Sequence, residues 1–525
     1  MEHFQISIFD ITVIGLYLVF IIWWGLKNGK SDDSQSYFLA GRSMSWWVVG
    51  LSLFAASISS TTLIGQAGDA YHTGLGVFNY NLTGVLVMVF FAICILPLYI
   101  KSKIFTIPEF LEKRFDRRSR YYFSTICILG NIFLDAAGAL YAAALILKLI
   151  LPDVDLQLII IIFAIIAASY TIPGGLSSAI NAEIIQAGIL IVGSIALTVI
   201  CFIQGGDYFI DLYANGDLSL KLIRPLSDTA TPWLGLIVGM PILGLYFWAN
   251  NQTLVQRVLS SKTIDEGRKG VMFTGFLTLS TLVIIAIPGV ISRSLFPGLE
   301  KPDMVYPNMV LNLMPVGLLG IMLAALLSAL TSTLSAILNS TSTLFTIDFY
   351  AQFNKNATSR HIVHVGKIAS VGIIVIAALW APYIGMFGSL LKYYQEMLSY
   401  VSPPIVAAFL MGIFSRRING NGAFAGLMTG LGIAVIMLFF KNSIFGSLHF
   451  LYIVPILLII SMIIMWVVSK CGEKPKEEKL KTTTYSLSDF KKEISTLRQG
   501  NILSNYLTWG FALVVMCLFI LLIFS

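Results

Sequence analysis

Hydroxyl-bearing side chains gather in two apolar stretches of the chain, and their oxygen atoms suit a small, hard cation. The first stretch is Ala55-Ala56-Ser57-Ile58-Ser59-Ser60-Thr61-Thr62, followed by Gly65 and Gly68. Hydroxyls this dense compete for backbone hydrogen bonds and favour a break in a helix. Inside a membrane, such a break frees carbonyl oxygens to bind a solute or an ion. The alternative is that small residues here only let helices pack closely.

The second stretch, from Ser328 to Thr341, reads as a continuous helix with hydroxyls along it. Ala329, Ser332 and Thr333 share one face, because residues i, i+3 and i+4 are neighbours on a helix. Two hydroxyls, together with carbonyls from a broken helix, supply the several oxygens that Na+ needs without a strong acid to hold it permanently. The alternative is that these hydroxyls bond back to the preceding turn.

A further stretch, Gly239-Met240-Pro241-Ile242-Leu243-Gly244, also favours a break. Proline removes one backbone donor, and glycine tolerates an irregular backbone. This stretch lies five apolar spans after the first break, a separation expected if residues 46–205 and 232–414 form two inverted repeats. A solute site would then lie between the two breaks. The alternative is a simple kink.

The elements that must position these residues are transmembrane helices. Of the 525 residues, 57% are hydrophobic and 12% are charged, which lies far outside the composition of a soluble domain. Windows long enough to cross a bilayer as helix occur about fourteen times. They cover residues 9–27, 46–71, 75–100, 121–149, 155–172, 178–204, 232–254, 270–292, 308–346, 363–382, 384–414, 421–440, 448–469 and 504–524. The sequence therefore predicts one all-α, polytopic membrane domain over residues 1–525.

Basic residues occur in alternate connections between these spans, as cytoplasmic loops require. They lie at 101–120, 257–269, 355–360 and 416–417, whereas the opposite set of loops is poor in base or acidic. An even number of spans then places both termini outside. The polar insert at 470–501 is predicted to be a cytoplasmic linker, helical in part from Ser488 onward. The short loops favour a bacterial inner membrane over other plasma membranes.

Several other classes of protein are disfavoured. The net charge of +7 does not indicate nucleic acid, because the basic residues lie between apolar segments and not on one face of a soluble fold. No span carries His-Glu-x-x-His, Gly-x-Ser-x-Gly or paired aspartates at proteolytic spacing, so an enzyme is not predicted. A receptor would need a signalling domain, for which the insert is too short. The sequence predicts a bilayer as partner and gives no sign of an obligate protein partner.

Specific motifs lie in order between residues 10 and 440. They include Tyr37-Phe-Leu-Ala-Gly-Arg-Ser, Thr106-Ile-Pro-Glu-Phe-Leu-Glu-Lys-Arg-Phe, Tyr170-Thr-Ile-Pro-Gly-Gly-Leu, Val255-Gln-Arg-Val-Leu-Ser-Ser-Lys and Leu338-Asn-Ser-Thr-Ser-Thr-Leu-Phe-Thr-Ile-Asp. At these residues the chain resembles the sodium/solute symporter family, and within it the sodium/glucose cotransporter branch. The resemblance implies a LeuT-like fold with one helix before the two repeats and three after them. It also implies Na+-coupled import of a sugar or sugar-like solute.

The resemblance further implies where the ion and the solute bind. The Na+ site falls on the carbonyls of Ala55, Ile58 and Ala329 and the hydroxyls of Ser332 and Thr333. The substrate site falls on Tyr80 and Gln395, which match the family, and on Thr62, Gln66, Asn81, Phe247 and Thr278. The family has an acidic residue at Asn81, a lysine at Thr278 and a tyrosine at Phe247.

Because these replacements remove charge or shorten polar groups, the pocket is predicted to be roomier and to offer fewer direct bonds. Galactose or glucose therefore does not carry over. A neutral hexose derivative, an acetylated amino sugar, an inositol or another polyol, or a disaccharide would fit a larger neutral pocket. The family alternative is a monocarboxylate, sialic acid, amino acid or vitamin.

Two acidic residues inside the spans need an account, because an ionised group at the bilayer centre costs about 2.5 to 3.5 kcal/mol. Asp135 would repel an anionic substrate, or it bonds a neighbouring helix. Glu183 stands where the family shows an aspartate near the Na+ site and the inner exit. Both are predicted to act in ion exit or coupling.

Overall fold

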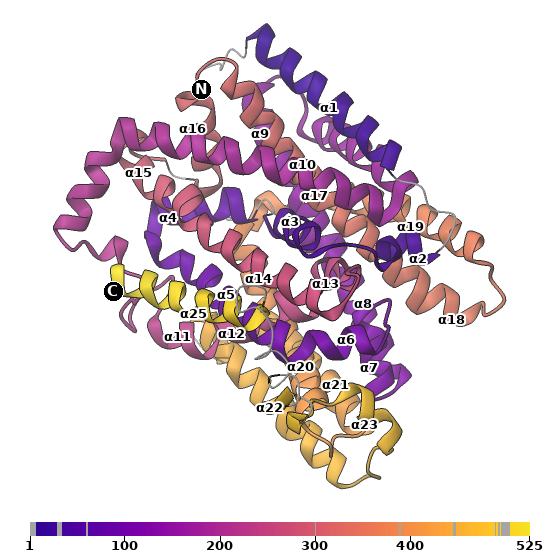
Figure 1. Ribbon diagram of the computed structural model, residues 1–525. Coiled ribbons are helices and arrows are strands. Elements are labelled where there is room, and N and C mark those ends of the chain that lie inside the picture. Colours follow the sequence, from indigo (N-terminus) through magenta and orange to yellow (C-terminus); the bar gives the residue numbers. More distant parts are fainter. Residues whose placement is uncertain are drawn as a thin grey trace.

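A computed structural model describes residues 7–28, 34–58, 61–299, 301–387, 390–444, 448–488, 490–491, 494 and 505–525. Helices dominate it (Figure 1). Apolar runs fold this way in a bilayer because a helix satisfies its backbone hydrogen bonds within one segment. The α-helices are α1 (Ile8–Asn28), α2 (Ser34–Leu39), α3 (Trp46–Ser57), α4 (Gln66–Thr73), α5 (Asn79–Phe90), α6 (Leu96–Lys101), α7 (Ile107–Arg114), α8 (Arg117–Gly130), α9 (Ala137–Ile150), α10 (Leu156–Ala214), α11 (Trp233–Val238), α12 (Met240–Leu245), α13 (Gln252–Leu259), α14 (Ile264–Thr281), α15 (Ile287–Leu295), α16 (Val305–Leu313), α17 (Leu318–Thr343), α18 (Ala351–Phe353), α19 (Ser359–Trp380), α20 (Leu390–Phe414), α21 (Gly420–Ile444), α22 (Phe450–Lys470), α23 (Glu477–Thr483) and α25 (Tyr506–Ile523).

The predicted spans correspond one by one to apolar segments of the structure, because Gly175, with φ 62° and ψ −157°, divides α10 into the spans Leu156–Pro173 and Gly175–Ala214. Within the described residues, twelve helices are long and apolar enough to cross a membrane. The bent pair Trp46–Ser57 and Thr62–Thr73 supplies a further crossing, and the shorter apolar helix Ile8–Trp24 precedes it. Several spans contain short π-helical turns, among them Asn131–Ala136, Tyr246–Asn250 and Leu344–Tyr350.

The first predicted break is present. Helix α3 ends at Ser57, and Ile58 leaves the helix with φ −80° and ψ 76°. The chain resumes as a π-helical turn, Thr61–Gly65, which leads into α4. The two halves of this span are bent by 63°. Two hydroxyl residues of the predicted break, Ser59 and Ser60, lie outside the described residues.

The second predicted break, at Gly239 to Gly244, is present as an interruption and not as a bend: α11 ends at Val238, Gly239 stands between the two helices, and α12 begins at Met240. Residues Trp233–Asn250 form one span, and Gly239 keeps helical angles, with φ −101° and ψ −51°. Pro241 lies in the first turn of α12, where its missing N–H removes little from the helix. The backbone leaves the helix only at Asn251, with φ −71° and ψ 117°. The Asn251 side chain caps α13 by accepting a hydrogen bond from Thr253 N–H at 2.8 Å.

The predicted span 308–346 is also wrong at its start, because α16 and α17 are separate helices. Gly317 precedes α17 with φ 89°, a conformation that favours glycine. The Asp10 carboxylate of α1 accepts hydrogen bonds from Gly317 N–H at 2.9 Å and Gly320 N–H at 2.7 Å. Asp10 therefore caps the start of α17 from another helix. The apolar sequence runs through this turn, so hydropathy alone does not reveal it.

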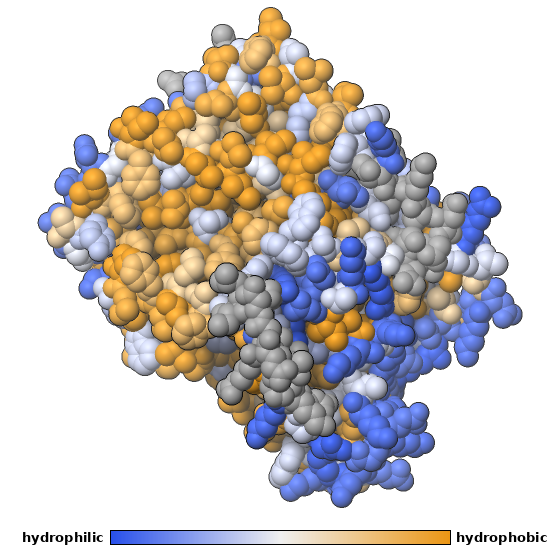
Figure 2. Space-filling view, viewed as in Figure 1, coloured by the Kyte–Doolittle hydropathy of each residue, from blue (hydrophilic) through white to orange (hydrophobic). Residues whose placement is uncertain are grey.

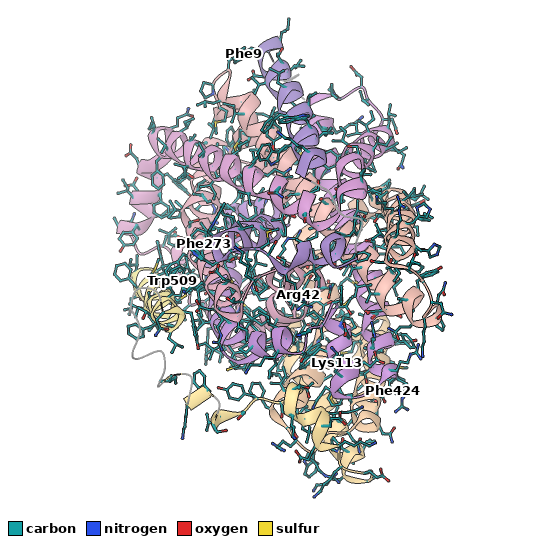
Figure 3. All side chains as sticks on the ribbon, turned by 45° about the vertical axis from the view of Figure 1, so that its right-hand side comes forward. Phe9, Arg42, Lys113, Phe273, Phe424 and Trp509 are labelled. Atoms are coloured by element: carbon teal, nitrogen blue, oxygen red, sulfur yellow. The ribbon has the colours of Figure 1, made fainter. Side chains whose placement is uncertain are left out.

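One end of the molecule is hydrophilic. Figure 2 shows polar surface gathered at the end where Figure 1 places α7, α18 and α23, with hydrophobic surface over much of the remaining face. Lys113 lies at this end and Phe9 at the opposite end (Figure 3). Leu222 N–H donates to the Phe524 carbonyl at 2.7 Å, so the end of α25 lies beside the acidic loop that follows α10. The side of the membrane that each terminus faces stays a prediction.

The insert at 470–501 packs against the hydrophilic end. It contains α23, on which Leu480 and Thr483 are buried. The Lys479 ammonium donates to the Phe115 carbonyl at 2.6 Å, and the Ser102 hydroxyl donates to the Thr482 carbonyl at 3.3 Å. The insert therefore joins the α6 to α8 region. Most of the stretch predicted to be helical from Ser488 to residue 501 lies outside the described residues.

Candidate functional site

A cavity lies beside the end of α3. About 850 Å³ of space lies between its walls when the open mouth is included. Seven of its lining residues are the predicted substrate residues: Thr62, Gln66, Tyr80, Asn81, Phe247, Thr278 and Gln395. They come from five separate parts of the chain, between the first broken span and α20. The fold thus brings all seven together.

One wall of the cavity is a series of hydrogen bonds between α4, α5 and α14. The Asn81 amide N–H group donates to Gln66 Oε1 at 3.1 Å and to Thr281 Oγ1 at 2.6 Å. The Thr281 hydroxyl donates to the Thr278 carbonyl at 2.6 Å. Both N–H donors of Asn81 have partners, so its amide oxygen is the atom it can offer a solute. Thr281 was not predicted, although its place three residues after Thr278 puts it on the same helix face.

Two polar atoms on this wall are buried without a partner among the described residues. They are Gln66 Nε2 and Thr278 Oγ1. Buried polar atoms nearly always have a hydrogen-bond partner, so an exception needs an explanation. Both residues line the cavity, and a hydroxylated solute would supply the missing partners. The wall therefore offers an amide donor, a hydroxyl and an amide oxygen within one small region.

The remaining walls are largely apolar and carry no cation. Phe54, Tyr80, Phe247 and Trp248 line the cavity, and the rings of Phe247 and Trp248 meet edge to face with centroids 5.1 Å apart. No lysine, arginine or histidine is among the described lining residues. Aromatic faces suit the C–H surface of a sugar ring, and the lack of cations leaves an anionic group without a counter-charge.

Asp135 lies behind this cavity. Its side chain hydrogen-bonds with that of Tyr394, which lines the cavity beside Gln395. Asp135 is not itself a lining residue. Of the two roles proposed from the sequence, the structure supports the bond to a neighbouring helix, because Tyr394 belongs to α20 and Asp135 to the turn before α9. The Asp135 carboxylate thus lies directly behind a residue that lines the cavity.

The predicted Na+ residues belong to α3, to Ile58 at its end and to α17, and α3 packs against α17. The Ser332 and Thr333 hydroxyls both donate to the Ala329 carbonyl, each at 2.9 Å. This is the back-bonding expected of such residues in helices, and it still leaves lone pairs on both hydroxyl oxygens. Helix α3 ends at Ser57, where the Phe54 carbonyl still accepts from Ile58 N–H at 2.9 Å and the Ser57 carbonyl accepts from the Thr62 hydroxyl at 3.0 Å; the carbonyls at a helix end are otherwise open to other partners. Ile58 lines the cavity, so one of the predicted Na+ residues also borders the predicted substrate residues.

Glu183 of α10 forms a buried ion pair. It also contacts Ser52 of α3, which lies about one turn before Ala55. The Arg257 guanidinium donates to both carboxylate oxygens, with Nε 3.1 Å from Oε2, and the Ser52 hydroxyl also donates to Oε2. Neither charged side chain is exposed to solvent. A bidentate pair of this kind holds α10, α13 and α3 together. Arg257 was missed from the sequence, although it lies within the motif that begins at Val255.

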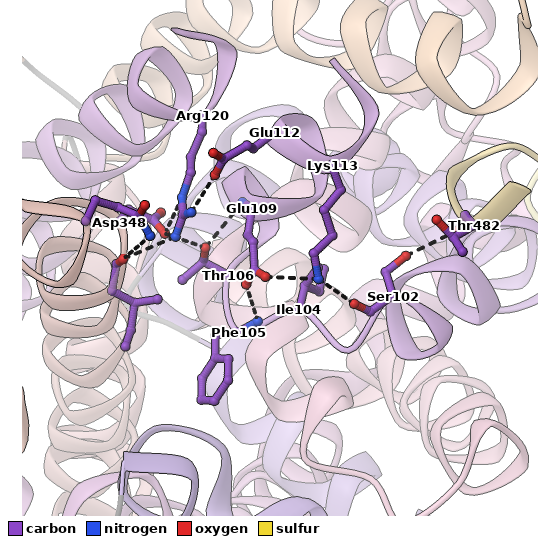
Figure 4. A network of polar contacts seen from close by, with 12 residues as sticks. Ser102, Ile104, Phe105, Thr106, Glu109, Glu112, Lys113, Arg120, Asp348 and Thr482 are labelled. Carbon is purple, nitrogen blue, oxygen red and sulfur yellow. Dashed lines mark hydrogen bonds and ion pairs between the residues drawn. The ribbon is translucent and has the colours of Figure 1, made fainter. Parts of the chain in front are cut away.

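A second buried network lies near the hydrophilic end (Figure 4). The Asp348 carboxylate accepts hydrogen bonds from Thr106 at 2.7 Å, Ser124 at 2.5 Å and the Arg120 Nε and Nη2 at 3.0 and 2.6 Å. Arg120 also bonds Glu112 at 2.6 Å. Asp348 lies in the π-helical turn after α17, so this network ties the helix that carries the predicted Na+ residues Ser332 and Thr333 to the α7 and α8 region. Sequence reasoning gave no role to this network.

Known proteins resemble the chain along most of its length. A profile of the sodium:solute symporter family matches residues 37–430. The chain is 33% identical to sodium/glucose cotransporter 1 of Sus scrofa, over 92% of this chain and 82% of that one. It is also 33% identical to solute carrier family 5 member 4 of Rattus norvegicus, over 92% of this chain and 81% of the relative.

Among solved structures, the substrate-bound, outward-open state of a Na+-coupled sialic acid symporter superposes with a TM-score of 0.80. The two sequences are 22% identical, and the match covers 90% of this chain and all of the other. This likeness concerns the fold alone. It confirms the predicted all-α, LeuT-like architecture.

Proposed function

The chain belongs to the sodium:solute symporter family, and we propose that it imports a neutral sugar or sugar-like solute together with Na+. A hexose derivative, a polyol and an amino sugar are the solutes that fit this description. The observation that carries the proposal is the meeting of seven predicted substrate residues on one cavity, beside the break that ends α3.

The solute is neutral and rich in hydroxyls because of what the cavity offers it. Among the described residues, Gln66 Nε2 is a donor without a partner and Thr278 Oγ1 is a hydroxyl without one, and Asn81 retains its amide oxygen as an acceptor. A site built for hydroxyl groups rejects solutes that leave its buried polar atoms unpaired. With Asp135 behind Tyr394 and no cation among the described lining residues, a carboxylate would be disfavoured.

Sodium binds between the C-terminal end of α3, where the span bends, and the facing part of α17. The carbonyls of Ala55, Ile58 and Ala329 and the hydroxyls of Ser332 and Thr333 provide oxygens for a hard cation. One Na+ moving down 100 mV supplies about 2.3 kcal/mol, and a tenfold gradient adds about 1.4 kcal/mol. Together they support accumulation of a few hundred-fold, so one ion per solute is sufficient.

The polar networks on the other side of the Na+ site keep that side closed while solute and ion bind. Glu183 and Arg257 join α10 to α13, and Asp348 joins the end of α17 to Arg120 of α8. Transport then requires that the repeats 46–205 and 232–414 rock and that the Glu183 pair separates as Na+ leaves. The hydrophilic end faces the cytoplasm, both termini face outward, and the membrane is a bacterial inner membrane.

A thermal-shift screen tests the proposal. The purified protein would be heated with a panel of sugars, polyols, monocarboxylates and sialic acid, in NaCl and in KCl at equal ionic strength. Binding to the folded state raises the unfolding midpoint. We expect a neutral hydroxylated solute to raise it in NaCl only. A shift by a carboxylate alone would overturn the assignment of the solute and favour transport of a monocarboxylate or of sialic acid.

A further inference from the structure

Gln186 on α10 is a buried amide without a hydrogen-bond partner. Its side chain is 1% exposed, and neither Nε2 nor Oε1 has a partner among the described residues. Leaving one such group unsatisfied costs roughly 1 to 3 kcal/mol. An apolar residue of similar size would avoid this cost. A polar side chain in such a place therefore needs a ligand that the described part of the chain does not supply.

Helix geometry places Gln186 beside the end of α3. Glu183 lies three residues earlier on the same face of α10, and its carboxylate accepts a hydrogen bond from Ser52 of α3. Both helices run away from the hydrophilic end, because α3 begins next to the basic loop before α14 and α10 ends at the acidic loop. One turn further along both helices, Gln186 therefore lies at the level of Ala55.

The packing of α10 against α17 gives the same position independently. A Cβ atom placed on Gly193 would contact the Met322 side chain, so these two residues lie opposite each other. The segment of α10 after Gly175 and α17 run in opposite directions, since Gly193 faces the start of α17 and Glu183 lies nearer the hydrophilic end. Gln186 lies seven residues before Gly193 on α10, and Ala329 lies seven residues after Met322 on α17. Because the two helices are antiparallel, Gln186 is therefore opposite Ala329. Both estimates place the amide at the oxygens assigned to Na+.

We propose that Gln186 contributes its side-chain oxygen to the Na+ bound between α3 and α17. An amide oxygen is a neutral, hard ligand of the same kind as the carbonyls of Ala55 and Ala329. Na+ would thus be held by three helices, and α10, which also carries Glu183, would respond directly to its arrival and departure. This inference rests on the proposed Na+ coupling and adds a ligand to it.

The test is a titration of the unfolding midpoint with NaCl, at constant ionic strength set with KCl. Gln186→Met removes the amide at nearly constant volume. We expect its midpoint without Na+ to equal or exceed that of the unmodified protein, because an unsatisfied amide has gone. We expect the Na+ concentration that gives half of the stabilisation to rise about tenfold, which corresponds to about 1.4 kcal/mol of lost ion binding. Gln186→Leu serves if the methionine variant does not fold.

Asn339→Leu is the matched control. Asn339 is likewise a buried amide with neither polar atom partnered among the described residues, but it lies seven residues beyond Ser332 on α17, which is about 10 Å. Its Na+ titration should match that of the unmodified protein. An equal weakening in the Asn339 and Gln186 variants would overturn the inference, since it would mark a general effect of buried amides.

Ser332→Ala separates failure of the inference from failure of the proposed function. If Ser332→Ala weakens the response to Na+ and Gln186→Met leaves it unchanged, Gln186 is not a ligand while the Na+ site stands. If the unmodified protein shows no stabilisation by Na+, or if Ser332→Ala responds normally, the Na+ site itself is wrong and the inference falls with it.

Discussion

The cavity wall and the Asp348 network are both polar clusters within an apolar protein, yet they differ in how complete they are. In the cavity, Gln66 Nε2 and Thr278 Oγ1 have no partner among the described residues. In the network, the Asp348 carboxylate accepts four hydrogen bonds from three side chains. The polar atoms of the cavity wall would gain hydrogen-bond partners only from a bound solute, whereas the Asp348 carboxylate has its partners within the protein.

This difference indicates that the cavity wall serves binding of the solute and that the Asp348 network serves stability of the fold. Removing a polar group from the cavity should change the stability of the fold little but should weaken binding of the solute. Groups in the network should behave in the opposite way, because a buried charge left alone is strongly destabilising. Each of the following substitutions tests which behaviour a given residue has.

Removing the cation of the network should have the largest effect. Arg120→Leu leaves the Asp348 carboxylate buried and without its ion pair, so we expect a loss of about 3 to 5 kcal/mol in unfolding free energy. The measurement is the unfolding midpoint and the monodisperse yield in detergent. Glu112→Gln is the control, because Glu112 is 30% exposed and its pair should contribute about 1 kcal/mol or less. An Arg120→Leu protein as stable as the control would show that the network is dispensable.

Ser332→Ala should weaken the binding of Na+ without lowering the stability of the fold. The loss of one ligand is expected to raise the Na+ concentration for half-maximal uptake about tenfold, or about 1.4 kcal/mol, at unchanged surface expression. Ser342→Ala is the matched control on α17, because Ser342 makes the same back-bond, to the Asn339 carbonyl at 3.1 Å. Equal loss of uptake and expression in the Ser332 variant would assign Ser332 to packing.

A pair of threonines on α14 sharpens the comparison further. Thr278→Val removes a hydroxyl that has no partner in the described part of the chain, so the KM for the solute should rise several-fold while the unfolding midpoint stays constant or increases. Thr274→Val removes a hydroxyl that donates to the Gly50 and Gly270 carbonyls, at 3.1 and 3.0 Å. That variant should lose about 1 kcal/mol of stability and keep its KM. The reverse pattern would contradict the division between the two regions.

The smallest effect is expected in the insert. Lys479→Met loses the hydrogen bond to the Phe115 carbonyl, which should lower the unfolding free energy by about 0.5 to 1.5 kcal/mol. Lys481→Met, on the exposed side of α23, should change nothing measurable. Indistinguishable midpoints for the two variants would mean that the insert does not hold the α6 to α8 region.

Local composition was sufficient to predict the spans and the bend of α3. Apolar runs are required by the bilayer, and the dense hydroxyls from Ser57 onward compete with the helix, so both signals lie in neighbouring residues. The seven cavity residues were found only through resemblance, because they are far apart in the sequence. Their meeting on one cavity is a property of the fold.

Features that depend on distant partners were missed. Pro241 and Gly239 indicated a break, but only Gly239 interrupts the helix, because proline in a first turn is compatible with a helix; the backbone leaves helical angles only at Asn251. The turn before α17 is fixed by Asp10, more than three hundred residues away in sequence. Arg257 and Arg120 could be recognised as buried ion-pair residues only once the helices that carry Glu183 and Asp348 had been placed beside them.

The most direct test of the account is solute uptake into proteoliposomes driven by an imposed Na+ gradient, using the solute that the thermal-shift screen identifies. We predict that a neutral sugar or polyol accumulates above its external concentration with an inward Na+ gradient, and that an equal K+ gradient gives no accumulation. Ser332→Ala should require more Na+ for the same rate. Accumulation that is independent of Na+, or that occurs only for a carboxylate, would contradict the account.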